Sequence, residues 1–122
     1  MQNNKILIIE DSSLLTNFML NEINAQFYYE IVTATSRYEA KRLLRKNADL
    51  YFCALVDLNL PDAPNGEAVQ DVIYYDIPIL IFTDNEDTLV RKALLEQGVV
   101  EYALKNNRTN FNYLLRLIRR LD

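Results

Sequence analysis

Short apolar runs alternate along the chain with segments whose apolar positions recur every three or four residues. The runs are rich in β-branched residues and favour strands, whereas the spacing of the other segments favours amphipathic helices. The five expected strands are Ile6–Ile9, Tyr29–Ala34, Tyr51–Val56, Ile79–Phe82 and Val99–Leu104. A helical pattern follows each strand after a short connection, so the chain predicts five successive strand–helix units without a linker or repeat.

Polar residues and glycine mark the ends of several expected helices. Ser12 and Ser13 are suited to cap the first helix, and Ser36 with Glu39 forms the S-x-x-E pattern of a capping box at the second. Gly98 is expected to close the fourth helix. The helical patterns run through Leu15, Phe18, Met19 and Ile23; Ala40, Leu43 and Leu44; Val69, Val72 and Ile73; Leu89, Ala93 and Leu94; and Phe111, Leu114, Leu115, Ile118 and Leu121.

The expected strands are apolar along their whole length rather than at every second position. Such strands are buried on both faces, which is typical of a parallel sheet covered by helices on each side. With right-handed crossovers, the predicted fold class is a doubly wound α/β domain. A chain of 122 residues is the length of one domain, so residues 1–122 are expected to form it.

The composition excludes several kinds of chemistry. The chain has no histidine, which rules out a Ser-His-Asp or Cys-His site and histidine metal ligands. Its two glycines cannot supply a glycine-rich dinucleotide loop or a P-loop. The single cysteine, Cys53, lies in an apolar run and is expected to be an inert core residue. Carboxylates, hydroxyls and lysine remain for chemistry.

The net charge of -4 does not suggest binding to nucleic acid or to an anionic membrane. The arginines near the end of the chain, Arg116, Arg119 and Arg120, are interpreted as a solvated helix face whose cations suit the negative end of the helix dipole. There is neither a signal-peptide pattern nor an apolar stretch long enough to span a bilayer, so a cytoplasmic location is expected.

Residues capable of chemistry stand at the end of four expected strands. They are Glu10 and Asp11 after the first strand, Asp57 after the third, Thr83 and Asp84 at the fourth, and Lys105 after the fifth. In a doubly wound sheet, ligands bind beyond the carboxyl ends of the strands, where the strand order reverses. If the first and third strands are neighbours, three carboxylates meet in one crevice.

Crowded carboxylates raise one another's pKa values, and a hard cation such as Mg²⁺ relieves the repulsion. With a lysine and a hydroxyl beside them, the arrangement is suited to phosphoryl transfer. Each residue also has a plain structural alternative. Asp57 could begin a turn, Thr83 and Asp84 could cap a helix, and Lys105 could be a surface cation. Glu10 and Asp11 could favour the positive end of the first helix. Their occurrence at successive strand ends favours one shared site.

The motifs "ILIIEDS", "ALVDLNLPD", "ILIFTD" and "VVEYALK" resemble, in order and spacing, the receiver domain of two-component response regulators. The resemblance covers essentially the whole chain. It implies a flavodoxin-like fold with a five-stranded parallel sheet in the order 2-1-3-4-5 and five helices. It also implies a signalling phosphoacceptor domain that assists its own phosphorylation and dephosphorylation, rather than a conventional enzyme.

The resemblance assigns roles to the strand-end residues. Asp57 would accept a phosphoryl group from a histidine kinase or phosphotransfer protein. Asp11 and Asp57 would bind Mg²⁺ with the Asn59 backbone carbonyl, and Glu10 would act through a metal-bound water. Thr83 and Lys105 would hold the phosphoryl oxygens.

The resemblance also implies a switch. Tyr102 stands where the family has its switch aromatic, although an ordinary strand aromatic is the alternative. Together with Thr83 it would link the site to the surface of helix four, strand five and helix five. That surface is also the candidate homodimer interface.

Three positions depart from the family pattern. Gly66 comes nine residues after Asp57, one later than usual, so the loop between them is expected to carry an extra residue. Asp84 replaces a small residue, and we expect it to face the crevice and repel an incoming donor unless it caps helix four. Asn106 replaces a proline, and we expect a trans Lys105–Asn106 peptide because a cis bond before a non-proline residue costs about 3–4 kcal/mol.

Other readings remain open at this point. Parts of the chain also look like receivers placed ahead of diguanylate cyclase domains, which makes such a domain a candidate output partner. A Toprim-like metal enzyme is an alternative, although that fold expects an Asp-x-Asp pair and Asn59 occupies the second position. A degenerate receiver that acts only as a docking module is the third reading.

Overall fold

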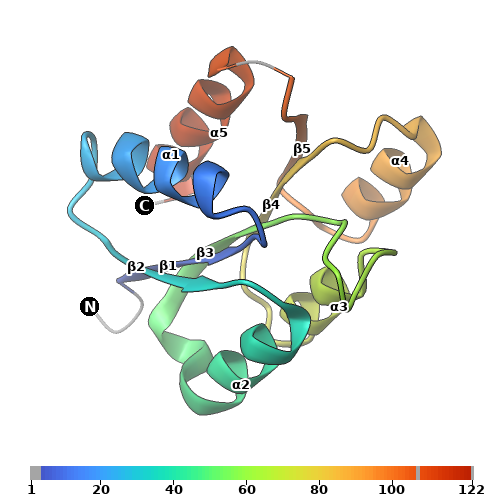
Figure 1. Cartoon of the computed structure of the whole chain (residues 1–122), viewed down its shortest axis with the longest axis horizontal. Helices are drawn as coiled ribbons and strands as arrows, with labels where there is room; N and C mark the ends of the chain where they lie inside the picture. Colours follow the sequence, from blue (N-terminus) through green and yellow to red (C-terminus); the bar gives the residue numbers. More distant parts are fainter. Residues whose placement is uncertain (1–3, 107, 122) are drawn as a thin grey trace.

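The computed structural model describes residues 4–106 and 108–121 (Figure 1). The elements are β1 (Lys5–Ile9), α1 (Ser13–Asn24), β2 (Glu30–Ala34), α2 (Arg37–Asn47), a 3-10 helix η1 (Ala48–Leu50), β3 (Tyr51–Val56), α3 (Glu67–Tyr74), β4 (Ile79–Thr83), α4 (Thr88–Glu96), β5 (Glu101–Leu104) and α5 (Arg108–Leu121). The strands form one parallel sheet in the order β2-β1-β3-β4-β5. The predicted fold class and strand order are confirmed.

Helices cover both faces of the sheet (Figure 1). α1 and α5 pack on one face, where Ile8, Leu55 and Phe111 are buried together. α2, α3 and α4 lie against the other face, which buries Leu7 and Val56. Successive strand residues point to opposite faces, so two covered faces require apolar residues at every strand position. No helix in the described part of the chain is long and apolar enough to cross a membrane.

The structure departs from the predicted elements in a few places. Lys5 pairs with Tyr51 and Ile6 with Cys53, so Phe52 is an extra residue that forms a bulge in β3. Phe52 and Cys53 consequently face the same layer of helices. The 3-10 helix was not predicted, and β5 begins two residues later than expected. Burial raises the pKa of the Cys53 thiol to about 12, which suits an inert core residue.

The helix ends follow the expected capping chemistry except at α4, where burial also differs from the prediction. The hydroxyl oxygens of Ser12 and Ser36 accept the predicted backbone N–H bonds at the starts of α1 and α2. The carboxylate of Asp87 accepts N–H bonds at the start of α4, so the alternative that Asp84 caps this helix is wrong. Leu89 and Ala93, both expected on the apolar pattern of α4, are exposed, Leu89 to 76%, whereas Leu94 of the same pattern is buried.

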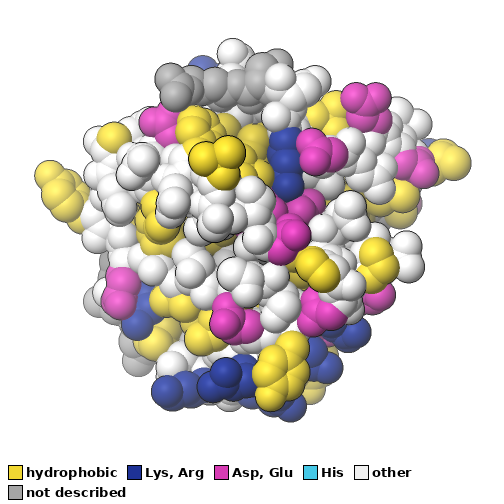
Figure 2. Space-filling view, viewed as in Figure 1, with side chains coloured by type: hydrophobic (Ala, Val, Ile, Leu, Met, Phe, Trp, Pro, Cys, Tyr) yellow, Lys and Arg dark blue, Asp and Glu magenta, His cyan; other side chains and the backbone are white. Residues whose placement is uncertain are grey.

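One group of basic residues lies together on the surface of the molecule (Figure 2). A row of basic side chains runs along the lower rim of this view, where Figure 1 places α2. The basic residues of α2 are Arg37, Lys41, Arg42, Arg45 and Lys46. The last turn of α5 carries Arg119 and Arg120.

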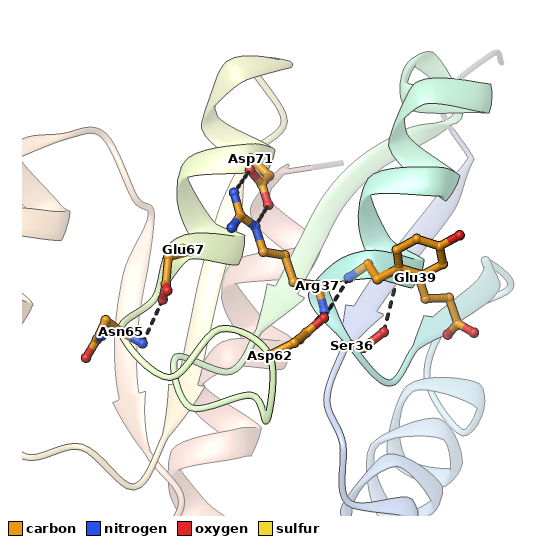
Figure 3. Close-up of polar contacts among 8 residues, drawn as sticks. Ser36, Arg37, Glu39, Asp62, Asn65, Glu67 and Asp71 are labelled. Atoms are coloured by element: carbon orange, nitrogen blue, oxygen red, sulfur yellow. Dashed lines mark hydrogen bonds and ion pairs between the residues drawn. The ribbon is translucent and has the colours of Figure 1, made fainter.

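The loop from β3 to α3 is fastened to α2 (Figure 3). The Asp62 carboxylate accepts the backbone N–H of Arg37 at 2.8 Å and that of Tyr38 at 3.0 Å, which caps α2 from outside its own segment. The Arg37 guanidinium in turn donates two bonds to Asp71 of α3, at 2.8 and 3.1 Å. Because Asn59 belongs to this loop, the α2 N-terminus helps to fix one wall of the predicted site.

The Asp62 cap predicts a pH-dependent loss of stability. The backbone bonds from Arg37 and Tyr38 lower the pKa of Asp62, so the stability they give is present above the usual carboxyl pKa of about 3.9 and lost as pH falls through the lowered pKa. We expect Asp62→Ala to lower the melting temperature by a few degrees at pH 7. The difference from the wild type should shrink toward pH 3.

Thermal unfolding followed by circular dichroism at several pH values measures this difference. Asp49→Ala is the matched control, since Asp49 is exposed and makes no described hydrogen bond or ion pair. A loss that is equal for the two variants, or unchanged between pH 7 and pH 3, would contradict a role for the Asp62 cap.

Candidate phosphorylation site

The strand register brings the predicted site residues to one edge of the sheet. Ile9 pairs with Val56, and the Asp57 N–H donates to the Ile9 carbonyl at 3.0 Å, so Glu10 and Asp57 leave neighbouring strands side by side. The Lys105 N–H donates to the Thr83 carbonyl at 2.9 Å, which extends the β4–β5 pairing to the lysine.

These strand ends surround a crevice of about 530 Å³. Its lining consists of Glu10, Asp11, Ser12, Asp57, Leu58, Asn59, Pro64, Asp84, Asn85 and Lys105. Acidic side chains lie beside and below a basic one near the centre of the face shown in Figure 2. All the predicted strand-end residues except Thr83 therefore line the crevice.

Lys105 joins the two buried carboxylates. Its Nζ lies 2.7 Å from Glu10 Oε1 and 3.0 Å from Asp57 Oδ2. Burial alone would lower the pKa of Lys105, but the bonds to both carboxylates outweigh it and raise that pKa. Burial raises the pKa of Glu10, and the bonds from Lys105 and from the Ser12 N–H only partly offset the effect. Lys105 thus stays charged, while ionised Glu10 is costly to bury.

The carboxylates have the arrangement and charge of a divalent cation site. One oxygen from each of Glu10, Asp11 and Asp57 lies within 4.8 Å of the others. Three ionised carboxylates beside one lysine leave two negative charges, which a Mg²⁺ ion would balance. Asp11 is exposed, so a hard cation there could retain several waters, as Mg²⁺ prefers. Asn59 also lines the crevice, and its N–H donates to Asp57 Oδ1 at 3.3 Å.

Thr83 and Tyr102 are connected through a residue that the sequence did not single out. Thr83 is fully buried, and its hydroxyl oxygen accepts the Asn85 N–H at 3.2 Å. The Tyr102 hydroxyl donates to the Asn85 carbonyl at 2.6 Å, and burial raises the pKa of that tyrosine. Because Asn85 contributes only backbone groups here, its residue type gave no signal for this role.

Of the three departures from the family pattern, Asp84 lines the crevice, and Asn106 directly follows Lys105 in the chain. Asp84 is exposed and forms part of the lining, and its expected repulsion of an incoming donor stays a prediction. No peptide bond among the described residues is cis, so the Lys105–Asn106 peptide is trans as expected. At Gly66 φ is +78°, and the N–H of this residue donates to the Leu58 carbonyl, which closes the longer loop onto itself.

Comparison with known proteins identifies the family. A model of the response regulator receiver domain matches residues 6–117. A chemotaxis protein CheY homolog of Campylobacter jejuni is 29% identical over 105 residues, covering 83% of this chain and 80% of that protein. The two-component response regulator ARR11 of Arabidopsis thaliana is 28% identical over 103 residues, covering 83% of this chain and 19% of that protein.

Comparison with solved structures indicates the same family. A probable two-component system response regulator/GGDEF domain protein is 37% identical with a TM-score of 0.83, over 98% of this chain and 47% of that one. The chain belongs to the response regulator receiver domain family, a class of signalling modules in two-component systems. It spans about half of the GGDEF-containing regulator and a fifth of ARR11. The predicted membership of the receiver family is confirmed, and the Toprim-like alternative is therefore wrong.

The buried Glu10 predicts a trade-off between stability and site chemistry. The pKa of Glu10 is higher in the folded protein than in the unfolded chain, so protonation of Glu10 stabilises the fold. This stabilisation is lost as pH rises through the folded pKa. We therefore expect Glu10→Gln to raise the melting temperature at pH 7 without divalent cations, by a few degrees, although it removes a charged partner of Lys105. The gain should shrink as pH falls toward 4.

Calorimetric or circular dichroism melts in the presence of a chelator measure this gain. Glu96→Gln on the exposed side of α4 is the control and should change little at either pH. A Glu10→Gln variant less stable than the wild type at pH 7 would show that the ion pair outweighs the cost of burial.

Proposed function

We propose that Asp57 of this receiver domain accepts a phosphoryl group from the phosphohistidine of a histidine kinase or phosphotransfer protein. The observation that carries the proposal is the position of Lys105 Nζ, bonded to both Glu10 and Asp57 beside a third carboxylate, Asp11. This set pairs a buried acceptor oxygen with positive charge and a place for Mg²⁺, which is what phosphoryl transfer requires.

The transfer forms a bond between phosphorus and an Asp57 carboxylate oxygen. It breaks the bond between phosphorus and the donor's imidazole nitrogen, which keeps the electron pair and takes up a proton. Lys105 Nζ, 3.0 Å from Asp57 Oδ2, is within reach of the oxygens of the transferred group. Mg²⁺ held by Asp11, Asp57 and the Asn59 carbonyl, with Glu10 acting through water, would supply further charge compensation.

Phosphorylation would be transmitted through Thr83. If its hydroxyl turns toward the phosphoryl group, it gives up the bond from the Asn85 N–H, and the Asn85 carbonyl is the partner of Tyr102. One local exchange would therefore alter the surface of α4, β5 and α5. A diguanylate cyclase-type output domain, as the GGDEF-containing relative suggests, or a second receiver would bind this surface.

The acceptor role predicts the effect of Asp57→Asn. With Mg²⁺ and acetyl phosphate, the wild type should gain the mass of one phosphoryl group, and the adduct should be labile to hydroxylamine. Asp57→Asn should fall to background because the carboxylate nucleophile is absent. Intact-protein mass spectrometry measures both. Asp76→Asn, exposed and outside the crevice, is the control. Full incorporation in Asp57→Asn would place the acceptor elsewhere, and none in the wild type would support the docking-module reading.

The Asn85 link predicts how far the response spreads. Beryllofluoride with Mg²⁺ should shift amide resonances of the wild type in the crevice and also along α4, β5 and α5. Tyr102→Phe removes the bond to the Asn85 carbonyl, so shifts beyond the crevice should become much smaller. Tyr113→Phe is the matched control, because that hydroxyl donates to Glu101 at 3.0 Å on the same face. Wild-type shifts confined to the crevice would contradict the proposed switch.

A further inference from the structure

The amide of Asn110 bridges the two residues that flank Lys105. Its Nδ2 donates to the Leu104 carbonyl at 2.8 Å and to Asn106 Oδ1 at 2.8 Å. Lys105 lies between these two acceptors in the chain. The turn that carries the lysine is therefore closed by a side chain from the first turn of α5.

The position of Asn110 is itself fixed by the core. The next residue, Phe111, is fully buried between Phe18 of α1 and Phe82 of β4, with ring centroids 5.4 and 5.3 Å apart. A buried aromatic ring held from two sides cannot shift without opening a cavity. Packing of Phe111 against α1 and β4 therefore fixes the start of α5, which places the Asn110 amide.

Two features leave the turn after β5 in need of the hydrogen bonds from Asn110. β5 is the edge strand of the sheet, so no further strand pairs with its outer side, and Asn110 supplies a donor to the Leu104 carbonyl. Asn106 also leaves the backbone after Lys105 freer than a proline, whose ring fixes φ. On the other side, the Lys105 N–H already donates to the Thr83 carbonyl. Together these bonds hold the lysine backbone from both sides.

We propose that Asn110 is a positioning residue for Lys105, and the proposal rests on the phosphorylation role of that lysine. By binding the Leu104 backbone carbonyl before Lys105 and the Asn106 side chain after it, Asn110 keeps Nζ between Glu10 and Asp57. The long lysine side chain is flexible, so its precision at the crevice depends on where its backbone is anchored. A displacement of about 1 Å is enough to slow a positioned reaction severely.

Two variants separate positioning from folding. Asn110→Ala removes both donated bonds. Asn110→Asp keeps the size of the side chain and suits the N-terminal turn of a helix, but it offers an acceptor where Leu104 and Asn106 need a donor. Asn112→Ala is the matched control, because Asn112 is an exposed asparagine of the same helix turn without a described hydrogen-bond partner.

The first measurement needs no phosphorylation. Lys105 is nearly buried and doubly ion-paired, so its ammonium protons should exchange slowly enough for a nitrogen–proton cross-peak, assigned by its absence in Lys105→Arg. We expect this cross-peak to shift or vanish in both Asn110 variants and to persist in Asn112→Ala. An unchanged cross-peak in both Asn110 variants overturns the proposal.

The second measurement is the rate of phosphorylation by acetyl phosphate with Mg²⁺. We expect it to fall about tenfold in both Asn110 variants, which corresponds to roughly 1.4 kcal/mol in the barrier, and to stay unchanged in Asn112→Ala. A slower rate with an unchanged Lys105 cross-peak also overturns the proposal, because the effect would then bypass the lysine. A wild type that is not phosphorylated refutes the proposed function, while the cross-peak still tests the position of Lys105.

Discussion

The bridge from Lys105 to Glu10 and Asp57 is the interaction on which the rest of the site depends. Parallel pairing of β1 with β3, and of β4 with β5, delivers these three residues to one edge of the sheet. Two buried carboxylates would otherwise repel each other in a region shielded from water. The bridge allows them to coexist, yet it leaves excess negative charge in the crevice. That residual charge is what makes the site fit a divalent cation.

Much of this arrangement could be predicted from the sequence, because it follows from regular patterns. Continuous apolar runs gave the parallel sheet, and the end of each run marked the edge where Glu10, Asp57 and Lys105 emerge. The capping serines of α1 and α2 followed from local chemistry within three residues. The family motifs then supplied the strand order and the roles proposed for the site residues.

The features that sequence reasoning missed depend on contacts between distant segments. Asp62 caps a helix that begins 25 residues earlier, and no local spacing predicts such a partner. Asn85 links Thr83 with Tyr102 through backbone groups alone, which any residue could provide. Asn110 looked like one polar residue among several near the end of the chain. The bulge at Phe52 was equally hidden, since an extra apolar residue does not interrupt an apolar run.

The crevice acids and the cations at the ends of α2 and α5 lie at opposite edges of the sheet, which affects how the domain approaches a charged partner. All helices of a doubly wound sheet start near the carboxyl edge of the strands and end near the amino edge. The cations in the last turns of α2 and α5 offset the partial negative charge of those helix ends. The crevice acids occupy the opposite edge. These two groups of charges therefore contribute an electric dipole moment along the strands, through which a positively charged partner surface attracts the crevice before contact. At physiological ionic strength this attraction acts over distances of about 8 Å, so it governs the final approach rather than the distant encounter.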